Sequence, residues 1–158
     1  MRIHKQKHQR GVAAVEFAII FVILFTMFYA LVSYTFPLVI LEALNHAAAQ
    51  ATRAALQVND NQSTSTYQSQ VTQVVTNTIT DQLSWMPTTI SSHLTHSIVY
   101  GGSGPSCGST ASSSSVICVT IQYPDYGTNP VVPSITLPVV GTVPHVPTAL
   151  VASATIAP

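Results

Sequence analysis

The sequence predicts an α+β protein: a long N-terminal helix that crosses a membrane, followed by a small exported domain with one amphipathic helix and a β-rich, proline-containing C-terminal part. Residues 12–40 are predominantly apolar and carry a single charge, and residues 66–86 repeat apolar side chains every three or four positions. Beyond Pro87, branched residues alternate with clusters of Gly, Pro and Ser. Only 6% of the 158 residues are charged, whereas a soluble domain has roughly 25%. The composition therefore argues against an ordinary cytosolic domain.

The few charges are distributed unevenly along the chain. Four of the five basic residues precede the apolar run, namely Arg2, Lys5, Lys7 and Arg10. Basic residues tend to stay on the cytoplasmic side of a membrane. We therefore expect residues 1–11 to be a cytoplasmic leader and everything beyond about residue 41 to be exported. An exported part with a single arginine, Arg53, has no electrostatic footprint for nucleic acid, so no nucleic-acid partner is expected.

The apolar run is long enough for one membrane-spanning helix. A helix of about 20 residues crosses a bilayer, and we assign residues 12–40 to the span, with membrane lipid as its partner. Pro37 predicts a bend near the outer leaflet, because proline removes a backbone donor. Residues 41–58 continue the helical pattern with many alanines, which favour helix and allow a neighbour to approach closely. The helix is therefore expected to extend into the periplasm as one long rod.

Residues 59–158 are expected to form the exported α+β domain. Turn-forming residues follow position 58, and the apolar spacing then predicts a second helix over 66–86, ended by Pro87. Strands are predicted at 97–100, 116–123, 135–140 and 149–156, of which 116–123 has the strongest pattern. The prolines between 124 and 147 restrict that tract to edge strands and extended loops.

The chain has two cysteines, Cys107 and Cys118. Both lie on the predicted exported side and flank a serine-rich loop, residues 108–115. An oxidising compartment favours a disulfide between them, and closing this loop would stabilise the fold by roughly 2 to 3 kcal/mol. The alternative is that both thiols stay reduced and buried.

Glu16 is the single charge inside the predicted span. A carboxylate near the start of a span is costly unless something balances it. If the chain is cut after Gly11, Val12 becomes a new amino terminus, and Glu16 lies one helical turn along on the same face. Two alternatives stay open at this point: a signal peptide cut near Ala49, and an uncleaved signal anchor with Glu16 at the headgroup level.

The sequence shows no catalytic constellation. It has no phosphate-cradling glycine loop and no His-Glu-x-x-His pair, and its Gly-x-Ser-x-Gly match at residues 104–108 lies between two predicted strands rather than at the strand-to-helix turn of a nucleophile elbow. His93 and His96 have no neighbouring cysteine or carboxylate to complete a metal set, so we expect them to be surface residues. The acidic residues of the exported part are scattered. We therefore expect neither an enzyme nor a cofactor or metal site.

Residues 11–18, the apolar span behind them and the alanine-rich stretch 45–55 together resemble the TadE-like minor pseudopilins of bacterial tight-adherence (Flp-type, type IVb/IVc) pilus systems. The resemblance covers about the first 56 residues. It implies that a prepilin peptidase cuts between Gly11 and Val12, so that Glu16 and Phe17 become the fifth and sixth residues of the mature chain. It also implies a single-pass protein of the bacterial inner membrane with a periplasmic C-terminal domain. Incorporation of this protein into a surface pilus is a further location that the resemblance allows.

The resemblance further implies partners and a mode of assembly. Partners would be other pilins and pseudopilins and the inner-membrane pilus assembly platform. An axial stagger between subunits would let Glu16 of one subunit meet the Val12 terminus of the next. Apolar helix contacts would come from Phe17, Ile20, Phe21 and Leu24.

The chain departs from the family pattern in one respect and differs from major pilins in another. Members often carry a proline a few residues after the Glu-Phe pair, where this chain has Val22. Major pilins of this class are little more than the membrane helix, so the sizeable exported domain favours a minor or initiating subunit that acts in pilus assembly and adherence. The alternative is an uncleaved, membrane-anchored periplasmic binding domain that never polymerises.

Overall fold

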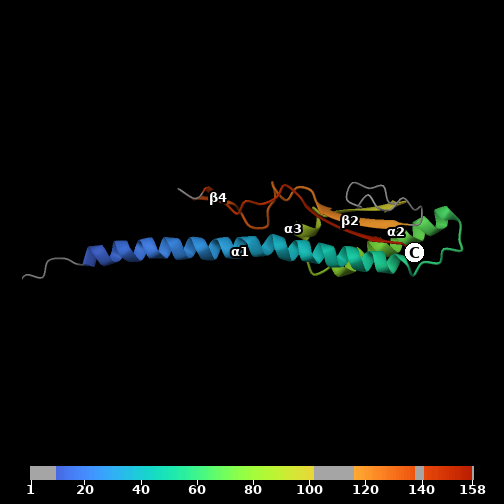
Figure 1. The fold of residues 1–158 in the computed structure, drawn as a ribbon, viewed down its shortest axis with the longest axis horizontal. Helices are drawn as coiled ribbons and strands as arrows, with labels where there is room; N and C mark the ends of the chain where they lie inside the picture. Colours follow the sequence, from blue (N-terminus) through green and yellow to red (C-terminus); the bar gives the residue numbers. More distant parts are fainter. Residues whose placement is uncertain (1–9, 102–115, 138–140, 158) are drawn as a thin grey trace, which may run out of the picture.

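The computed structural model describes residues 10–101, 116–137 and 141–157. A single helix, α1 (Arg10–Ala55), runs along most of the molecule, and the sheet and α2 lie beside its C-terminal half (Figure 1). The other helices are α2 (Thr64–Gln82) and the short α3 (Thr88–Ser91); the strands are β1 (Thr95–Tyr100), β2 (Ile117–Tyr123), β3 (Ile135–Leu137), β4 (Gly141–Val143) and β5 (Leu150–Ile156). The predicted α+β class is confirmed.

β2 is the central strand of a three-stranded antiparallel sheet in the order β1-β2-β5. Val119, in its middle, pairs with Ile98 of β1 on one side and with Ala154 of β5 on the other. Side chains of a strand alternate between the two faces, and every second residue from Ile117 to Tyr123 joins the hydrophobic core. The segment with the strongest strand pattern in the sequence is therefore the centre of the sheet.

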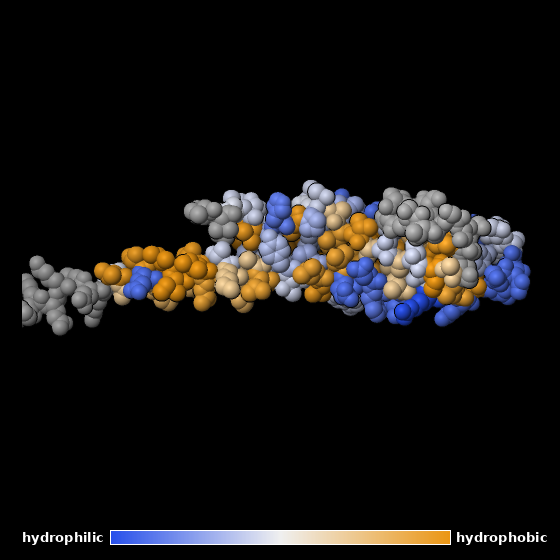
Figure 2. Space-filling model, viewed as in Figure 1, coloured by the Kyte–Doolittle hydropathy of each residue, from blue (hydrophilic) through white to orange (hydrophobic). Residues whose placement is uncertain are grey.

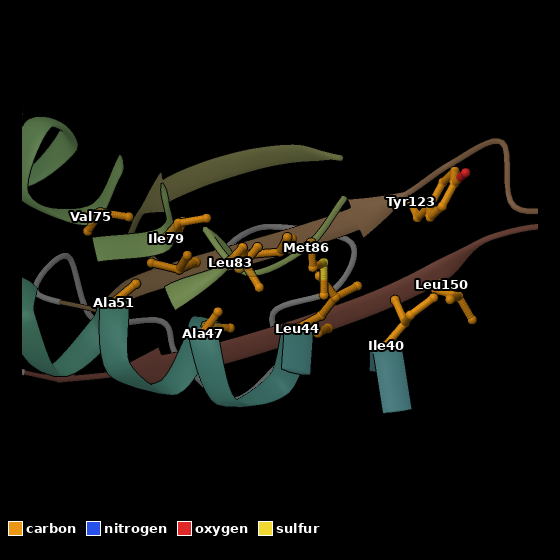
Figure 3. Packing of buried hydrophobic residues seen from close by; sticks show 14 of the residues in the cluster. Ile40, Leu44, Ala47, Ala51, Val75, Ile79, Leu83, Met86, Tyr123 and Leu150 are labelled. Carbon is orange, nitrogen blue, oxygen red and sulfur yellow. The ribbon is translucent and has the colours of Figure 1, made fainter. Parts of the chain in front are cut away.

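The C-terminal part of α1 presents a stripe of small and apolar residues to the same core (Figure 3). The stripe consists of Ile40, Leu44, Ala47, Ala48, Ala51 and Ala55, which recur at helical spacing. Opposite it, α2 contributes Val71, Val75 and Ile79. Small alanine side chains bring the helix axes close together, so packing against α2 and the sheet accounts for the alanine-rich segment.

The second helix begins and ends slightly earlier than the sequence predicts. α2 ends at Gln82, and the chain then turns through Leu83 and Met86, which are both buried in the core. α3 follows immediately after Pro87 and was not predicted, because four residues are too few for a periodic pattern. The predicted strands 97–100 and 149–156 correspond to β1 and β5.

The predicted strand 135–140 is only partly confirmed. Its first three residues form β3, which pairs with β4 in a separate two-stranded sheet, and residues 138–140 lie outside the described residues. β4 was not predicted. It begins at Gly141, whose φ of +86° is a conformation that other residues rarely adopt. The proline-rich tract thus forms a short hairpin of its own.

This hairpin lies beside the middle of α1, away from the three-stranded sheet (Figure 1). The Tyr29 hydroxyl donates a hydrogen bond to the Pro133 carbonyl oxygen at 2.6 Å, and the His145 backbone N–H donates to the Tyr34 hydroxyl oxygen at 3.1 Å. We call residues 131–137 and 141–147 the hairpin arm. The part of the chain that follows α1 therefore contacts this helix from about Tyr29 onward.

Pro37 does not interrupt α1. The helix is continuous from Arg10 to Ala55, and Figure 1 shows it as one nearly straight rod. The bend that proline predicts is thus not a sharp kink. Pro37 itself is buried, as is Ser33 one turn before it.

Candidate functional site

The site residues that the sequence predicts at the N-terminus all lie in the first turns of α1. Gly11, Val12, Glu16 and Phe17 are helical and exposed, with Val12 71% and Phe17 69% accessible. Val12 and Glu16 are four residues apart and therefore share a helix face. No ion pair to Glu16 occurs within the described part of the chain. The described part of the chain leaves this surface open to other molecules.

Gly11 has no packing role in the described structure. A Cβ atom added at this position would meet no heavy atom within 4 Å. The residue has helical backbone, in which glycine is less favourable than alanine by roughly 0.5 to 1 kcal/mol. Packing within the described chain thus gives no reason for a glycine here.

Aromatic rings form a ridge along the N-terminal half of α1. Phe17, Phe21, Phe25 and Tyr29 are stacked in succession, with ring centroids 6.0, 6.0 and 6.4 Å apart. We call these four residues the aromatic ridge. Phe17 and Phe21 were predicted from the sequence as helix contacts, but the continuation to Tyr29 was not. The regular four-residue spacing is the signal that could have revealed it.

A shallow apolar groove lies beside the aromatic ridge. It is lined by Ala14, Val15, Ala18, Ile19, Val22 and Ile23. The two alanines are one turn apart, and small residues at this spacing let another helix approach closely. Figure 2 shows that the surface of the N-terminal half of α1 is predominantly hydrophobic. Helices pack by fitting the ridges of one into the grooves of the other, and this surface offers both features.

Among the described helices, α1 is the one long and apolar enough, by length and composition, to cross a membrane. The most apolar stretch within Gly11–Ala55 is not buried by the rest of the structure. A core helix of a soluble protein would be covered over such a stretch. The helix is thus compatible with a single-pass membrane anchor.

The histidines singled out from the sequence do not converge. The His93 ring stacks on Tyr123 at a centroid distance of 5.4 Å, and its Nδ1 lies 3.8 Å from the Asp125 carboxylate. His96 Nε2 instead lies 3.2 Å from the Thr76 hydroxyl. Burial, and then the nearby Asp125 carboxylate, raise the pKa of the Tyr123 hydroxyl above its ordinary value. Within the described residues, no group of three or more His, Cys, Asp or Glu side chains could hold a metal ion.

The predicted disulfide is only half within the described residues. Cys118 lies in the central strand β2 and is fully buried. Cys107 lies outside the described residues. The pairing of the two cysteines therefore stays a prediction.

Two further depressions lie along α2. One follows α2 beside Tyr100, and the other is lined by Val39, Glu42, Ala43, His46, Gln82 and Trp85. Neither depression brings together a nucleophile, a base and an oxyanion donor among the described residues.

Comparison with known proteins bears on the N-terminal helix. The family model described as TadE-like protein matches residues 11–53. No curated protein and no solved structure matches the chain. The matched segment begins at Gly11 and contains the aromatic ridge, the groove and most of the stripe that α1 contributes to the core. Residues 11–53 are therefore identified as TadE-like, which supports the involvement of this chain in a Tad pilus system.

Proposed function

We propose that this chain is a minor pseudopilin of a tight-adherence (Flp-type) pilus system, processed after Gly11, that acts in pilus assembly or initiation and in surface adherence. One observation carries the proposal: the TadE-like match begins at Gly11, a glycine that the fold does not need, and continues into a helix surface that the described chain leaves uncovered. A prepilin peptidase that recognises this glycine would explain its presence.

In this proposal α1 crosses the bacterial inner membrane. Residues 1–11 are the cytoplasmic leader, which holds four of the five basic residues. Residues 12–40 form the span, residues 41–58 the periplasmic extension and residues 59–158 the exported domain. The buried stripe from Ile40 to Ala55 supports one refinement, since it makes the extension part of the core of the exported domain.

Electrostatics gives the processed terminus a role in assembly. Cleavage leaves an ammonium group on Val12, one turn from the Glu16 carboxylate, in a segment where hydrocarbon balances neither charge. A staggered neighbour that places its Val12 terminus against Glu16 balances both. A neighbour in the wrong register leaves a charge unpaired, which is costly at low dielectric. The pair would therefore select the register of the assembly as well as stabilise it.

Packing supplies the remaining contacts between subunits. The aromatic ridge of one helix would occupy the groove around Ala14 and Ala18 on a neighbouring pilin-type helix, as ridges pack into grooves. Because α1 is continuous into the core of the exported domain, the register chosen in the membrane also sets where that domain stands. Other pilins, pseudopilins and the inner-membrane assembly platform are the partners that this arrangement implies.

The experiment that tests this proposal is Glu16→Ala in the full chain, in its native membrane. Protein level and mature mass should stay unchanged, because the peptidase reads Gly11 most directly. Crosslinking to partner pilins and pilus-dependent adherence should drop, since losing one partner of a buried ion pair typically costs about 3 to 5 kcal/mol.

The matched control is Glu42→Ala, which removes an exposed carboxylate from the same helix beyond the proposed span. This variant should crosslink and adhere normally. If Glu16→Ala is also normal in both assays, Glu16 is not an assembly residue. If the unmutated chain itself keeps residues 1–11 and forms no crosslinks to pilins, the uncleaved membrane-anchored binding domain becomes the better account.

A further inference from the structure

The hairpin arm meets α1 inside its long apolar stretch. The hydrogen bonds at Tyr29 and Tyr34 place the arm beside this part of the helix. At about 1.5 Å per residue, Tyr29 lies about 26 Å and Tyr34 about 33 Å from Val12 along the helix axis. The hydrocarbon core of a bilayer is about 30 Å thick, and the headgroup regions bring the total to about 40 to 45 Å. If the hydrocarbon core begins near Val12, its outer boundary therefore lies at the level of the arm, and the last residues of the proposed span 12–40 lie beyond the hydrocarbon.

The uncovered side of α1 stays apolar beyond this level. Phe36, Leu38 and Val39 are between 45% and 64% exposed, and the first charge after Glu16 is Glu42. Val39 lies about 40 Å from Val12, which is about 10 Å beyond a hydrocarbon core that begins at Val12. The apolar surface of the helix therefore continues past the contacts that the arm makes.

The arm has the chemistry of an interfacial element. No Lys, Arg, Asp or Glu occurs from Tyr126 to the end of the chain. Ile135 in β3 is a large apolar residue that is 40% exposed. Tyrosine prefers the membrane–water interface, and the Tyr29 hydroxyl satisfies one carbonyl oxygen of the arm.

The backbone of the arm limits how deep it can lie. β3 and β4 pair with each other over three residues each, so their outer edges carry backbone groups outside the ladder. Headgroups and water can satisfy such groups, whereas hydrocarbon cannot. The arm is thus suited to the interface and unsuited to the bilayer centre.

We infer that the hairpin arm is a second membrane contact, seated on the lipid surface of the outer leaflet beside the point where α1 emerges. The inference rests on the proposed membrane span of α1. The arm would then hold α1 at a fixed depth and tie the exported domain to the bilayer surface.

Tryptophan quenching in vesicles tests the inference on the full chain. Trp85, which is exposed, is first replaced by Phe, and a single reporter is introduced as Ile135→Trp. The protein is reconstituted in phosphatidylcholine vesicles with or without brominated acyl chains. The Ile135→Trp emission should shift to the blue and be quenched by the brominated lipid.

Two further reporters make the result interpretable. Leu56→Trp lies at the far end of α1 at nearly the same exposure as Ile135, 42% against 40%, and should not be quenched. Phe25→Trp reports on the span itself and should be quenched strongly. Adding Tyr29→Phe, which removes the hydrogen bond to Pro133, should weaken quenching at Ile135→Trp and leave Phe25→Trp unchanged.

The outcomes distinguish the proposed membrane span of α1 from the lipid contact inferred for the hairpin arm. If Phe25→Trp is quenched and Ile135→Trp behaves like Leu56→Trp, the arm does not touch lipid and the inference is overturned, while the span stands. If Phe25→Trp is not quenched, the proposed span is wrong and the inference fails with it.

Discussion

Gly11 offers a way to separate processing from folding at the level of a single residue. We predict that Gly11→Leu leaves the full-length precursor in the membrane, because a peptidase cleft shaped for glycine excludes the larger side chain. The fold should not change, since a Cβ at this position meets nothing within 4 Å. Intact mass from purified membranes reads out processing, and circular dichroism reads out the fold. Normal cleavage of Gly11→Leu would refute the role given to this glycine.

Leu44 tests the claim that α1 shares one hydrophobic core with α2 and the three-stranded sheet. This residue is fully buried, so Leu44→Ala should lower the free energy of unfolding by about 2 to 5 kcal/mol. Leu38→Ala is the matched control, because Leu38 lies six residues earlier on the same helix and is 64% exposed. Thermal unfolding and protease resistance of the detergent-solubilised full chain would report the difference. Equal losses in both variants would contradict the packing described for α1.

At the scale of single residues, the sequence reveals those features that depend on residues close together in the chain. The separation of Gly11 from Glu16 and the four-residue repeat of Phe17, Phe21 and Phe25 are visible without a structure. The contact between Tyr29 and Pro133 joins residues 104 positions apart, and no local pattern specifies it.

Among the elements, the sequence predicts those that bury an apolar face. β2 and α2 have strong periodicities because one side of each packs on the core. α3 and β4 are three or four residues long, and the hairpin arm packs through backbone and tyrosine contacts that leave no periodic trace. Of the expected strand 135–140, residues 135–137 form β3 and pair with β4, which begins at Gly141, while residues 138–140 lie outside the described residues.

The two cysteines, one between β1 and β2 and one in β2, are the subject of a further prediction. We expect Cys107 and Cys118 to form one intramolecular disulfide, because both lie in the proposed periplasmic part, where oxidising conditions favour the bond. Mass analysis of the unreduced full chain should show a deficit of two hydrogens relative to the reduced form. Reduction should lower stability by roughly 2 to 3 kcal/mol. Rapid alkylation of both thiols in unreduced protein would exclude the bond.

The whole molecule consists of one long helix, α1, with α2 and the three-stranded sheet packed against its C-terminal half. The uncovered N-terminal half of α1 contains the beginning of the TadE-like match, the aromatic ridge and the groove. The C-terminal half packs against the sheet and α2. Because one continuous helix joins the two halves, contacts made by the uncovered half would set the position of the domain packed on the other half. This rigid coupling suits a subunit that must be placed in register with its neighbours.

The central claim is that the functional chain is a processed pseudopilin, and intact-mass measurement of the protein purified from its native membrane tests it most directly. The account predicts a mature chain that begins at Val12, with residues 1–11 removed. A mature chain that begins at Met1 would indicate an uncleaved anchor, and one that begins after Ala49 would indicate a signal peptide; either result would contradict the account.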